Sequence, residues 1–160
     1  MPRLLIVHHS PTPLVRLLTD AVVAGAHDDA IEGVEVVVRA ALEATADDVL
    51  AADGYLLGTT ANFGYMSGAL KHFFDTIFLT AGGALSDDGS GTPGAGGRKP
   101  YGLWVHGRYD TTGAVRSVAS IVQALPWRRA ADVLEVLGDV GAPELERGYE
   151  LGGTLAALLA

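Results

Sequence analysis

The chain has 160 residues, of which 49% are hydrophobic and 19% charged, a composition typical of one compact globular domain. Its formal net charge of −8 at pH 7 disfavours nucleic acid and anionic membranes as partners, because both are bound through basic patches. The chain has no cysteine, which excludes disulfides, thiolate metal sites and thiol nucleophiles, so redox chemistry would require a bound cofactor.

The N-terminal third alternates short apolar runs with amphipathic segments. Leu4–Val7 is wholly apolar and predicts a strand buried on both faces. Apolar residues then repeat at helical spacing from Leu14 to Gly25, which predicts the first helix. The valines within residues 34–38 predict a second strand, and Asp47–Ala52 predicts a brief helical turn.

The middle of the chain contains a third strand, a helix and a glycine-rich stretch. Gly54–Leu57 predicts a strand that breaks at Gly58. The following helix is expected to start near Ser67, a suitable N-cap, because an apolar stripe follows at Leu70, Phe73, Phe74 and Ile77. Residues 80–99 are rich in glycine and lack periodicity, so we expect a long flexible connection there.

The last third repeats the alternation of strand and helix. Tyr101–His106 predicts a fourth strand, Pro126 ends the helix after it, a fifth strand falls within Ala131–Leu137, and Pro143 opens the last helix. This βαβαβαβαβα pattern predicts an α/β fold, a three-layer sandwich around a doubly wound, five-stranded parallel sheet. We expect the strand order 2-1-3-4-5 and a single domain spanning residues 1–160.

The first loop of interest, His8–Pro13, lies between the first strand and the first helix. Open α/β sheets bind ligands at the carboxyl ends of their strands, and this loop is expected there. The hydroxyls of Ser10 and Thr12, with the unpaired amides of the helix start, form an anion site by geometry. The loop matches neither GxGxxG nor a Walker sequence. An ordinary turn that caps the helix is an equally good interpretation of this loop alone.

The second loop, Gly58–Ser67, follows the third strand. It supplies several backbone donors and two aromatic residues, Phe63 and Tyr65, at the same edge of the sheet. The alternative is a plain connection in which Phe63 and Met66 enter the core.

The third loop, Val105–Gly113, follows the fourth strand. It contains Arg108 as a cation and His106 as a hydrogen-bond donor toward a ligand. A solvated turn capped by Asp110 or Thr111 is the alternative.

Metal binding and nucleophilic catalysis are disfavoured. His8 and His9 are adjacent, so on a strand they point to opposite faces, and no carboxylate accompanies them at a metal-ligand spacing. No Gly-x-Ser-x-Gly elbow occurs. A phosphorelay receiver needs acidic residues where this chain has His8-His9 and Gly58-Thr59. We therefore expect neither a metal site nor a catalytic side chain.

Two segments resemble flavoprotein motifs. Gly58–Asp75 resembles the flavin-contacting loop of flavodoxin-like quinone and FMN reductases, Gly-Thr-Pro-x-x-Phe-Gly-x-Met-Ser-Gly, with Thr60 in place of proline. Ser10–Val15 resembles in spacing the Ser/Thr-x-Thr-Gly-x-Thr loop that binds the FMN phosphate in flavodoxins, with Pro13 in place of glycine. The resemblance implies a flavodoxin-like fold and bound FMN. It implies phosphate contacts at Ser10, Thr12, Pro13, Leu14 and Val15, ring contacts at Thr59, Thr60, Ala61, Asn62, Phe63 and Gly64, and contacts to the pyrimidine edge at His106, Gly107, Arg108, Tyr109 and Asp110.

The same resemblance implies an oxidoreductase that passes electrons from NAD(P)H through FMN to a quinone or similar acceptor. Two alternatives stay open: a flavodoxin-type one-electron carrier, and a flavin-free α/β binding module. Reductases of this type are often oligomers, and candidate interface residues are Phe78, Leu79, Tyr109 and Trp127. The first apolar run is too short for a signal peptide and no segment reaches about 18 apolar residues, so we expect a cytoplasmic protein.

Overall fold

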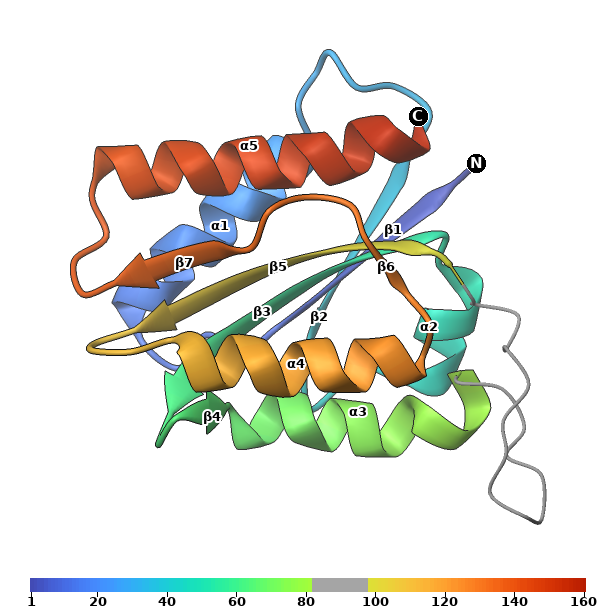
Figure 1. Ribbon diagram of the computed structural model, residues 1–160. Helices are drawn as coiled ribbons and strands as arrows, with labels where there is room; N and C mark the ends of the chain where they lie inside the picture. The colour runs from blue at the N-terminus through green and yellow to red at the C-terminus, as the bar shows by residue number, and fades with distance from the viewer. Residues whose placement is uncertain (82–97) are drawn as a thin grey trace.

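The computed structural model describes residues 1–81 and 98–160, in which strands and helices alternate along the chain (Figure 1). Most of the predicted connection over residues 80–99 lies outside this description. The strands are β1 (Arg3–His8), β2 (Glu35–Ala40), β3 (Gly54–Asn62), β4 (Tyr65–Met66), β5 (Pro100–Gly107), β6 (Arg128–Arg129) and β7 (Leu134–Leu137). The helices are α1 (Pro13–Ala26), α2 (Ala46–Ala51), α3 (Gly68–Ala81), α4 (Thr112–Ala124) and α5 (Ala142–Leu159).

Apart from β4, the strands pair in parallel. β3 lies between β1 and β5, β2 is at one edge, and both β6 and β7 lie beside β5 at the other. The expected order 2-1-3-4-5 is confirmed, with β5 and β7 as the predicted fourth and fifth strands. β6 pairs with the start of β5 and β7 with its end, so the fifth strand is preceded by a short separate segment along the same edge.

Helices cover both faces of the sheet, which gives three layers (Figure 1). Leu4, Ile6 and Leu56 pack with α1 and α5, whereas Leu5 and Leu57 pack with α2, α3 and α4. Alternate strand residues enter opposite cores because strand side chains point alternately to the two faces. Among the described residues, no helix combines the length and apolar content that a membrane crossing requires.

β3 is longer than the sequence predicts. Instead of breaking at Gly58 it continues to Asn62 and stays paired with β5 as far as Thr60. Gly58 lies within the strand because the indole of Trp104 occupies the space that a Cβ at Gly58 would need. The glycine therefore serves side-chain packing rather than a turn, and the predicted loop is shortened to a hairpin between β3 and β4.

Two other glycines set the distance between α1 and α5. A Cβ on Gly152 would overlap the carbonyl of Val22, and a Cβ on Gly25 would overlap the carbonyl of Tyr149. The two helix backbones thus touch at positions where neither has a side chain. This contact fixes the position of α1. The first predicted loop, His8–Pro13, leads into the first turn of this helix.

We expect Gly152→Ala to destabilise the protein by about 1–3 kcal/mol or more, because an added methyl group forces the two helix backbones apart. Gly153→Ala is the matched control, since its Cβ would lie 3.4 Å from the carbonyl of Gly25, an ordinary contact. The control should gain up to about 1 kcal/mol from helix propensity. Urea unfolding of both variants measures the difference, and equal stabilities would contradict the close backbone contact.

Candidate functional site

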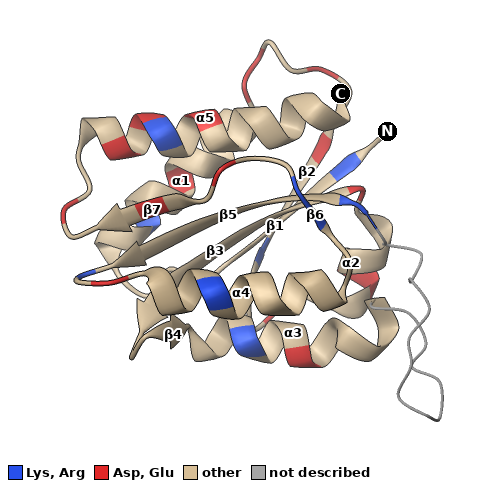
Figure 2. Cartoon of the chain, viewed as in Figure 1, with Lys and Arg blue, Asp and Glu red and all other residues tan. Residues whose placement is uncertain are grey.

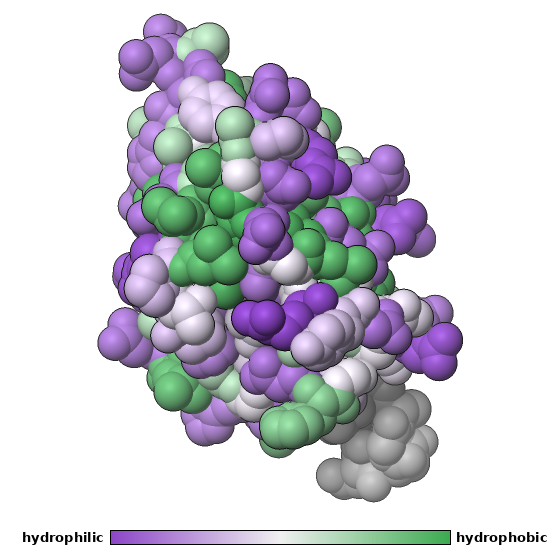
Figure 3. All heavy atoms as spheres, turned by 90° about the vertical axis from the view of Figure 1, so that its left-hand side faces the viewer, coloured by the Kyte–Doolittle hydropathy of each residue, from purple (hydrophilic) through white to green (hydrophobic). Residues whose placement is uncertain are grey.

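The three predicted loops meet in one pocket at the carboxyl edge of the sheet, with a volume of about 410 Å³. Its walls come from the first turn of α1, the end of β3 and the turn after β5. The lining residues are Pro11, Thr12, Leu14, Val15, Thr60, Ala61, Asn62, His106, Gly107 and Arg108. We call this the edge pocket. Figure 3 views this side of the molecule and shows apolar surface in the middle of the face, bordered by hydrophilic residues.

Nine of these ten lining residues were predicted as ligand contacts from the sequence. Pro11 is the exception, and only its position inside the first loop could have suggested it. The remaining predicted contacts lie outside the pocket lining: Ser10, Pro13, Thr59, Phe63, Gly64, Tyr109 and Asp110. Their surroundings explain why.

The hydroxyl of Ser10 is part of a short polar network beneath the first loop. Ser10 Oγ lies 2.8 Å from His8 Nδ1 and 2.7 Å from Thr19 Oγ1. Thr19 and His8 are buried, so this network fixes the loop against β1 and α1. Ser10 therefore holds the loop in place, and its predicted phosphate contact stays a prediction.

Burial lowers the pKa of the His8 imidazole, and the positive charge of Arg16 acts in the same direction. The nearby carboxylates of Asp20 and Glu43 oppose this shift only in part. His8 is consequently neutral at physiological pH, and its Nδ1 forms one hydrogen bond with Ser10 Oγ.

The first turn of α1 retains free donors toward the pocket. Thr12 is the N-cap, and its Oγ1 accepts from the amide of Val15 at 3.3 Å. Pro13 has no N–H. Within the described ranges, the amides of Thr12 and Leu14 have no acceptor. The loop therefore offers two free amides and one shared hydroxyl to an anion, at the positive end of the helix dipole.

Thr59 and Thr60 point to opposite faces of β3. Thr59 Oγ1 accepts from the amide of Ser67 at 2.9 Å and donates to the carbonyl of Thr60 at 2.9 Å, on the α3 side. Ser67 Oγ in turn accepts from the amide of Leu70, which makes it the expected N-cap of α3. Thr59 is therefore a structural residue, while Thr60 lines the edge pocket.

Thr60 is 8% exposed, and its Oγ1 has no hydrogen-bond partner in the part of the chain that the structure describes. A buried polar atom without a partner costs free energy, and such atoms in native structures usually meet a ligand or water. Because this oxygen is itself buried, a ligand in the edge pocket could meet it only after the Thr60 side chain rotates.

The turn between β3 and β4 holds Phe63 and Gly64 with positive φ angles of 53° and 74°. This matches the two-residue hairpin turn with φ above zero at both central positions, in which an aromatic residue is unusual. Phe63 is fully exposed, which contradicts the alternative that it enters the core, whereas Met66 is buried. A Cβ at Gly113 would overlap the carbonyl of Gly64, so the hairpin lies directly on the start of α4.

The third loop places its histidine differently from the prediction. His106 Nε2 donates to the carbonyl of Gly138 at 2.7 Å, because a carbonyl can only accept. The predicted hydrogen bond from His106 to a ligand would therefore have to come from the other ring nitrogen, Nδ1. Arg108 lines the pocket, whereas Tyr109 is 86% exposed and Asp110 accepts from the amide of Thr112, which agrees in part with a capped turn.

The expected interface residues are only partly accessible. Trp127 is buried and stacks on Tyr55 with ring centroids 3.9 Å apart, so it cannot contribute to an interface. Leu79 and Tyr109 are exposed. Across residues 1–81 and 98–160, no group of three or more His, Asp or Glu is arranged to hold a metal ion.

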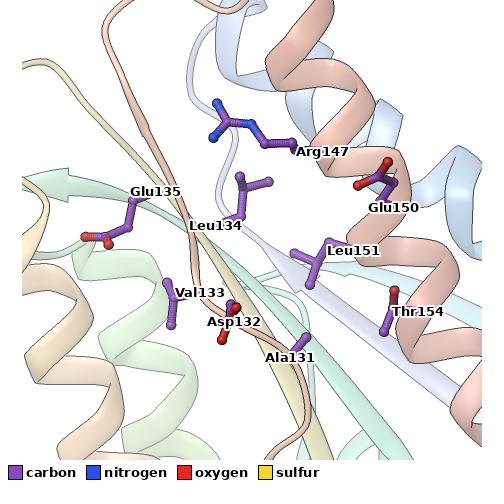
Figure 4. Close-up of a pocket in the computed structure, with 9 residues that line it drawn as sticks. All are labelled: Ala131, Asp132, Val133, Leu134, Glu135, Arg147, Glu150, Leu151 and Thr154. Atoms are coloured by element: carbon purple, nitrogen blue, oxygen red, sulfur yellow. The ribbon is translucent and has the colours of Figure 1, made fainter.

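A second hollow of about 550 Å³ lies between the segment before β7 and α5 (Figure 4). Arg147 and Glu150 border it from α5, and Glu135 points away from that helix toward Thr111, to which it is bonded at 2.7 Å. Its lining contains no residue of the three loops and mixes acidic and basic side chains. We therefore place the candidate site in the edge pocket.

Comparisons with known proteins agree with this architecture. No family model matches the chain. A flavodoxin of Aquifex aeolicus (strain VF5) is 35% identical over 77 residues, which are 48% of this chain and 40% of the flavodoxin, so the match spans less than half of that relative. A flavodoxin from the domain Archaea superposes with a TM-score of 0.78 at 16% identity, covering 98% of both chains.

Two further structures are similar over nearly the whole chain. A flavodoxin of Streptococcus pneumoniae TIGR4 has a TM-score of 0.73 at 22% identity, covering 98% of this chain and 99% of its own. A flavodoxin, WrbA-like protein of Agrobacterium tumefaciens has a TM-score of 0.73 at 15% identity, covering 99% and 98%. The chain therefore has the flavodoxin-like fold, which confirms the predicted fold class.

The unlike environments of Thr59 and Thr60 predict opposite effects of the same substitution. Thr59→Val should destabilise the protein by about 1–3 kcal/mol, because it leaves the buried amide of Ser67 without an acceptor. Thr60→Val should be neutral or stabilising without ligand, since it removes an unpartnered hydroxyl. Urea unfolding measures both variants, and a loss of stability in Thr60→Val would show that its hydroxyl has a partner.

Stability should fall on acidification because of His8. Its folded-state pKa is lowered, so the unfolded chain binds more protons below a pH of about 6.5, and stability is lost as pH falls from there toward the folded pKa. His8→Asn, which keeps a polar atom near Ser10, should reduce this slope between about pH 7.5 and 5.5. The same substitution at exposed His72 is the control, and identical slopes in both variants would refute the assignment.

Proposed function

We propose that this chain binds FMN in the edge pocket and passes electrons from NAD(P)H through it to a quinone or similar acceptor. The observation that carries the proposal is the convergence of three loops, far apart in sequence, on one pocket at the carboxyl edge of a flavodoxin-like sheet. The 35% identity to a flavodoxin over 77 residues supports a flavin as the ligand.

The polar groups of the pocket fit the two ends of FMN. The free amides of Thr12 and Leu14, at a helix N-terminus, suit a phosphate. The side chains of Asn62, His106 and Arg108 suit the pyrimidine part of the ring, which carries both N–H and carbonyl groups. The pocket thus offers donors and acceptors where the proposed ligand needs each.

A bound FMN would supply the redox chemistry: it takes a hydride, two electrons and one proton, from NAD(P)H, and reduces a quinone to a quinol with one further proton from solvent. The residues of the chain bind and orient. Arg108 would favour the negative charge that reduction places near the pyrimidine edge, because it is the cation among the lining residues. No side chain is needed as acid or base, and we expect this activity in the cytoplasm.

A flavodoxin-type one-electron carrier is the second candidate, since flavodoxins are prominent among the similar proteins. The two candidates share the FMN pocket and differ in the use of NAD(P)H. Anaerobic mixing of the FMN-loaded protein with NADH or NADPH separates them, because rapid bleaching of the flavin absorbance requires hydride transfer. Absence of bleaching by either nucleotide, with FMN bound, would favour the carrier.

FMN binding should depend on the first turn of α1. We expect added FMN to lose fluorescence on titration with the protein, and Thr12→Ala to weaken that binding by about 1.5–3 kcal/mol, the typical strength of a hydrogen bond to a charged group. Riboflavin, which lacks the phosphate, is the matched control and should bind both proteins equally. Equal FMN affinity of the variant would remove this loop from the site, and absence of FMN binding to the natural chain would favour the flavin-free binding module.

A further inference from the structure

A groove runs between α3 and α4 on the outer face of the molecule. Two hollows, of about 410 Å³ and about 280 Å³, lie along it and share Ser120 and Ile121. Figure 1 shows α3 and α4 side by side, with β4 at one end. From Gly113 to Ala124 the rise of α4 corresponds to about 16 Å, so the groove is long enough for an extended ligand.

One end of this groove lies across the hairpin of β3 and β4 from the edge pocket. Asn62 lines the edge pocket, whereas Gly64 and Tyr65, across the same hairpin turn, line the groove. The amide of Met66 donates to Ser117 Oγ at 3.2 Å, which holds the hairpin on α4 together with the close contact at Gly113. A ligand in the groove would therefore begin one hairpin turn away from a ligand in the pocket.

The hairpin end of the groove carries an uncompensated positive charge. Arg116 is exposed, and no carboxylate of the described residues lies within 4.0 Å of it. Lys71 differs, because its Nζ donates to Asp75 at 2.6 Å and this bond raises the pKa of the lysine. Figure 2 shows one basic band on each of these helices, with an acidic band beside the one on α3. An anion is thus favoured beside Arg116 and not at the far end.

Besides the charged residues and the two serines, Ser117 and Ser120, the groove is lined by aromatic and apolar residues. Tyr65, 43% exposed, lies at the same end as Arg116. Phe74, Phe78 and Ile121 line the far end. From the hairpin outward the groove therefore presents an aromatic ring, a cation and an apolar floor.

We propose that this groove is a dinucleotide subsite that holds the pyrophosphate of NADH at Arg116 and its adenine at the far end. The proposal rests on the proposed function, since the nicotinamide would then reach the pocket across the hairpin. NADH consists, in order, of a nicotinamide ring, a doubly anionic pyrophosphate and an adenine ring, and this order matches the groove from the hairpin outward. Because the far end has no unpaired cation among its lining residues and carries Asp75, a 2′-phosphate is disfavoured and NADH is preferred to NADPH.

ADP-ribose tests this directly, because it carries the adenosine and the pyrophosphate but no nicotinamide. Isothermal titration should show that it binds the natural chain and that Arg116→Gln weakens it about tenfold or more, the loss expected for charge-assisted hydrogen bonds. Arg128→Gln, an exposed arginine on β6, is the matched control and should leave the affinity unchanged. FMN affinity should be unchanged in both variants.

The outcomes separate this inference from the proposed function. ADP-ribose that fails to bind, or that binds Arg116→Gln equally well, overturns the subsite even when FMN binds normally. If the chain does not bind FMN but Arg116→Gln still loses ADP-ribose affinity, the groove is supported as a nucleotide site and only the flavin proposal is contradicted. A dimer that Ile121→Glu converts to monomers, with no ADP-ribose binding, would show that a second copy covers the groove.

Discussion

The parallel register of β3 between β1 and β5 is the constraint on which the site depends. His8 is level with Gly58, and Thr60 is level with His106. β1 thus ends at the level of Gly58, whereas β3 continues to Asn62 and β5 to Gly107, and the loop after β1 lines one pocket together with these longer strand ends. A slip of one residue would exchange the faces of Thr59 and Thr60, burying one hydroxyl in the wrong core and removing the acceptor of the Ser67 amide.

The hairpin after β3 separates the edge pocket from the groove of α3 and α4. Its turn needs positive φ at Phe63 and Gly64, a costly conformation for an aromatic residue. The contact of Gly64 with Gly113 and the bond from Met66 to Ser117 hold that conformation in place. The hairpin is thus a fixed partition, with the edge pocket on one side and the groove of α3 and α4 on the other.

The fold could be predicted from the sequence because strands buried on both faces must be apolar and the helices between them amphipathic. That pattern is local, and it was sufficient for the order of the strands. The features that the sequence did not predict depend on contacts between residues that are far apart in the chain. In the sequence, Gly58 indicates the end of a strand. Only the indole of Trp104 on the neighbouring strand shows that the glycine leaves room for a packed side chain. Trp127 reads as an interface residue, and only its stacking on Tyr55 shows that it is buried.

For the candidate site, too, the local features could be predicted and those that depend on distant contacts could not. Loop position could be predicted, so nine of the ten pocket residues were found, because a loop after a parallel strand has only one edge to occupy. The direction of each polar group could not be predicted. Ser10 turns inward to His8 and Thr19, and His106 donates through Nε2 to the carbonyl of Gly138, which lies 32 residues further along the chain and whose approach the local sequence does not encode.

The pocket and the groove would attract an anion through different interactions. In the pocket, an anion would meet backbone amides and a helix dipole, which are directional and partly shielded from salt. In the groove it would meet one exposed arginine, a longer-range and more easily screened attraction. A tightly oriented cofactor requires the first kind of contact, and a co-substrate that must leave in every cycle is served by the second. Within residues 1–81 and 98–160, neither Arg108 in the pocket nor Arg116 in the groove lies within 4.0 Å of a carboxylate, so a chain with a net charge of −8 keeps a cation at each of the two proposed sites.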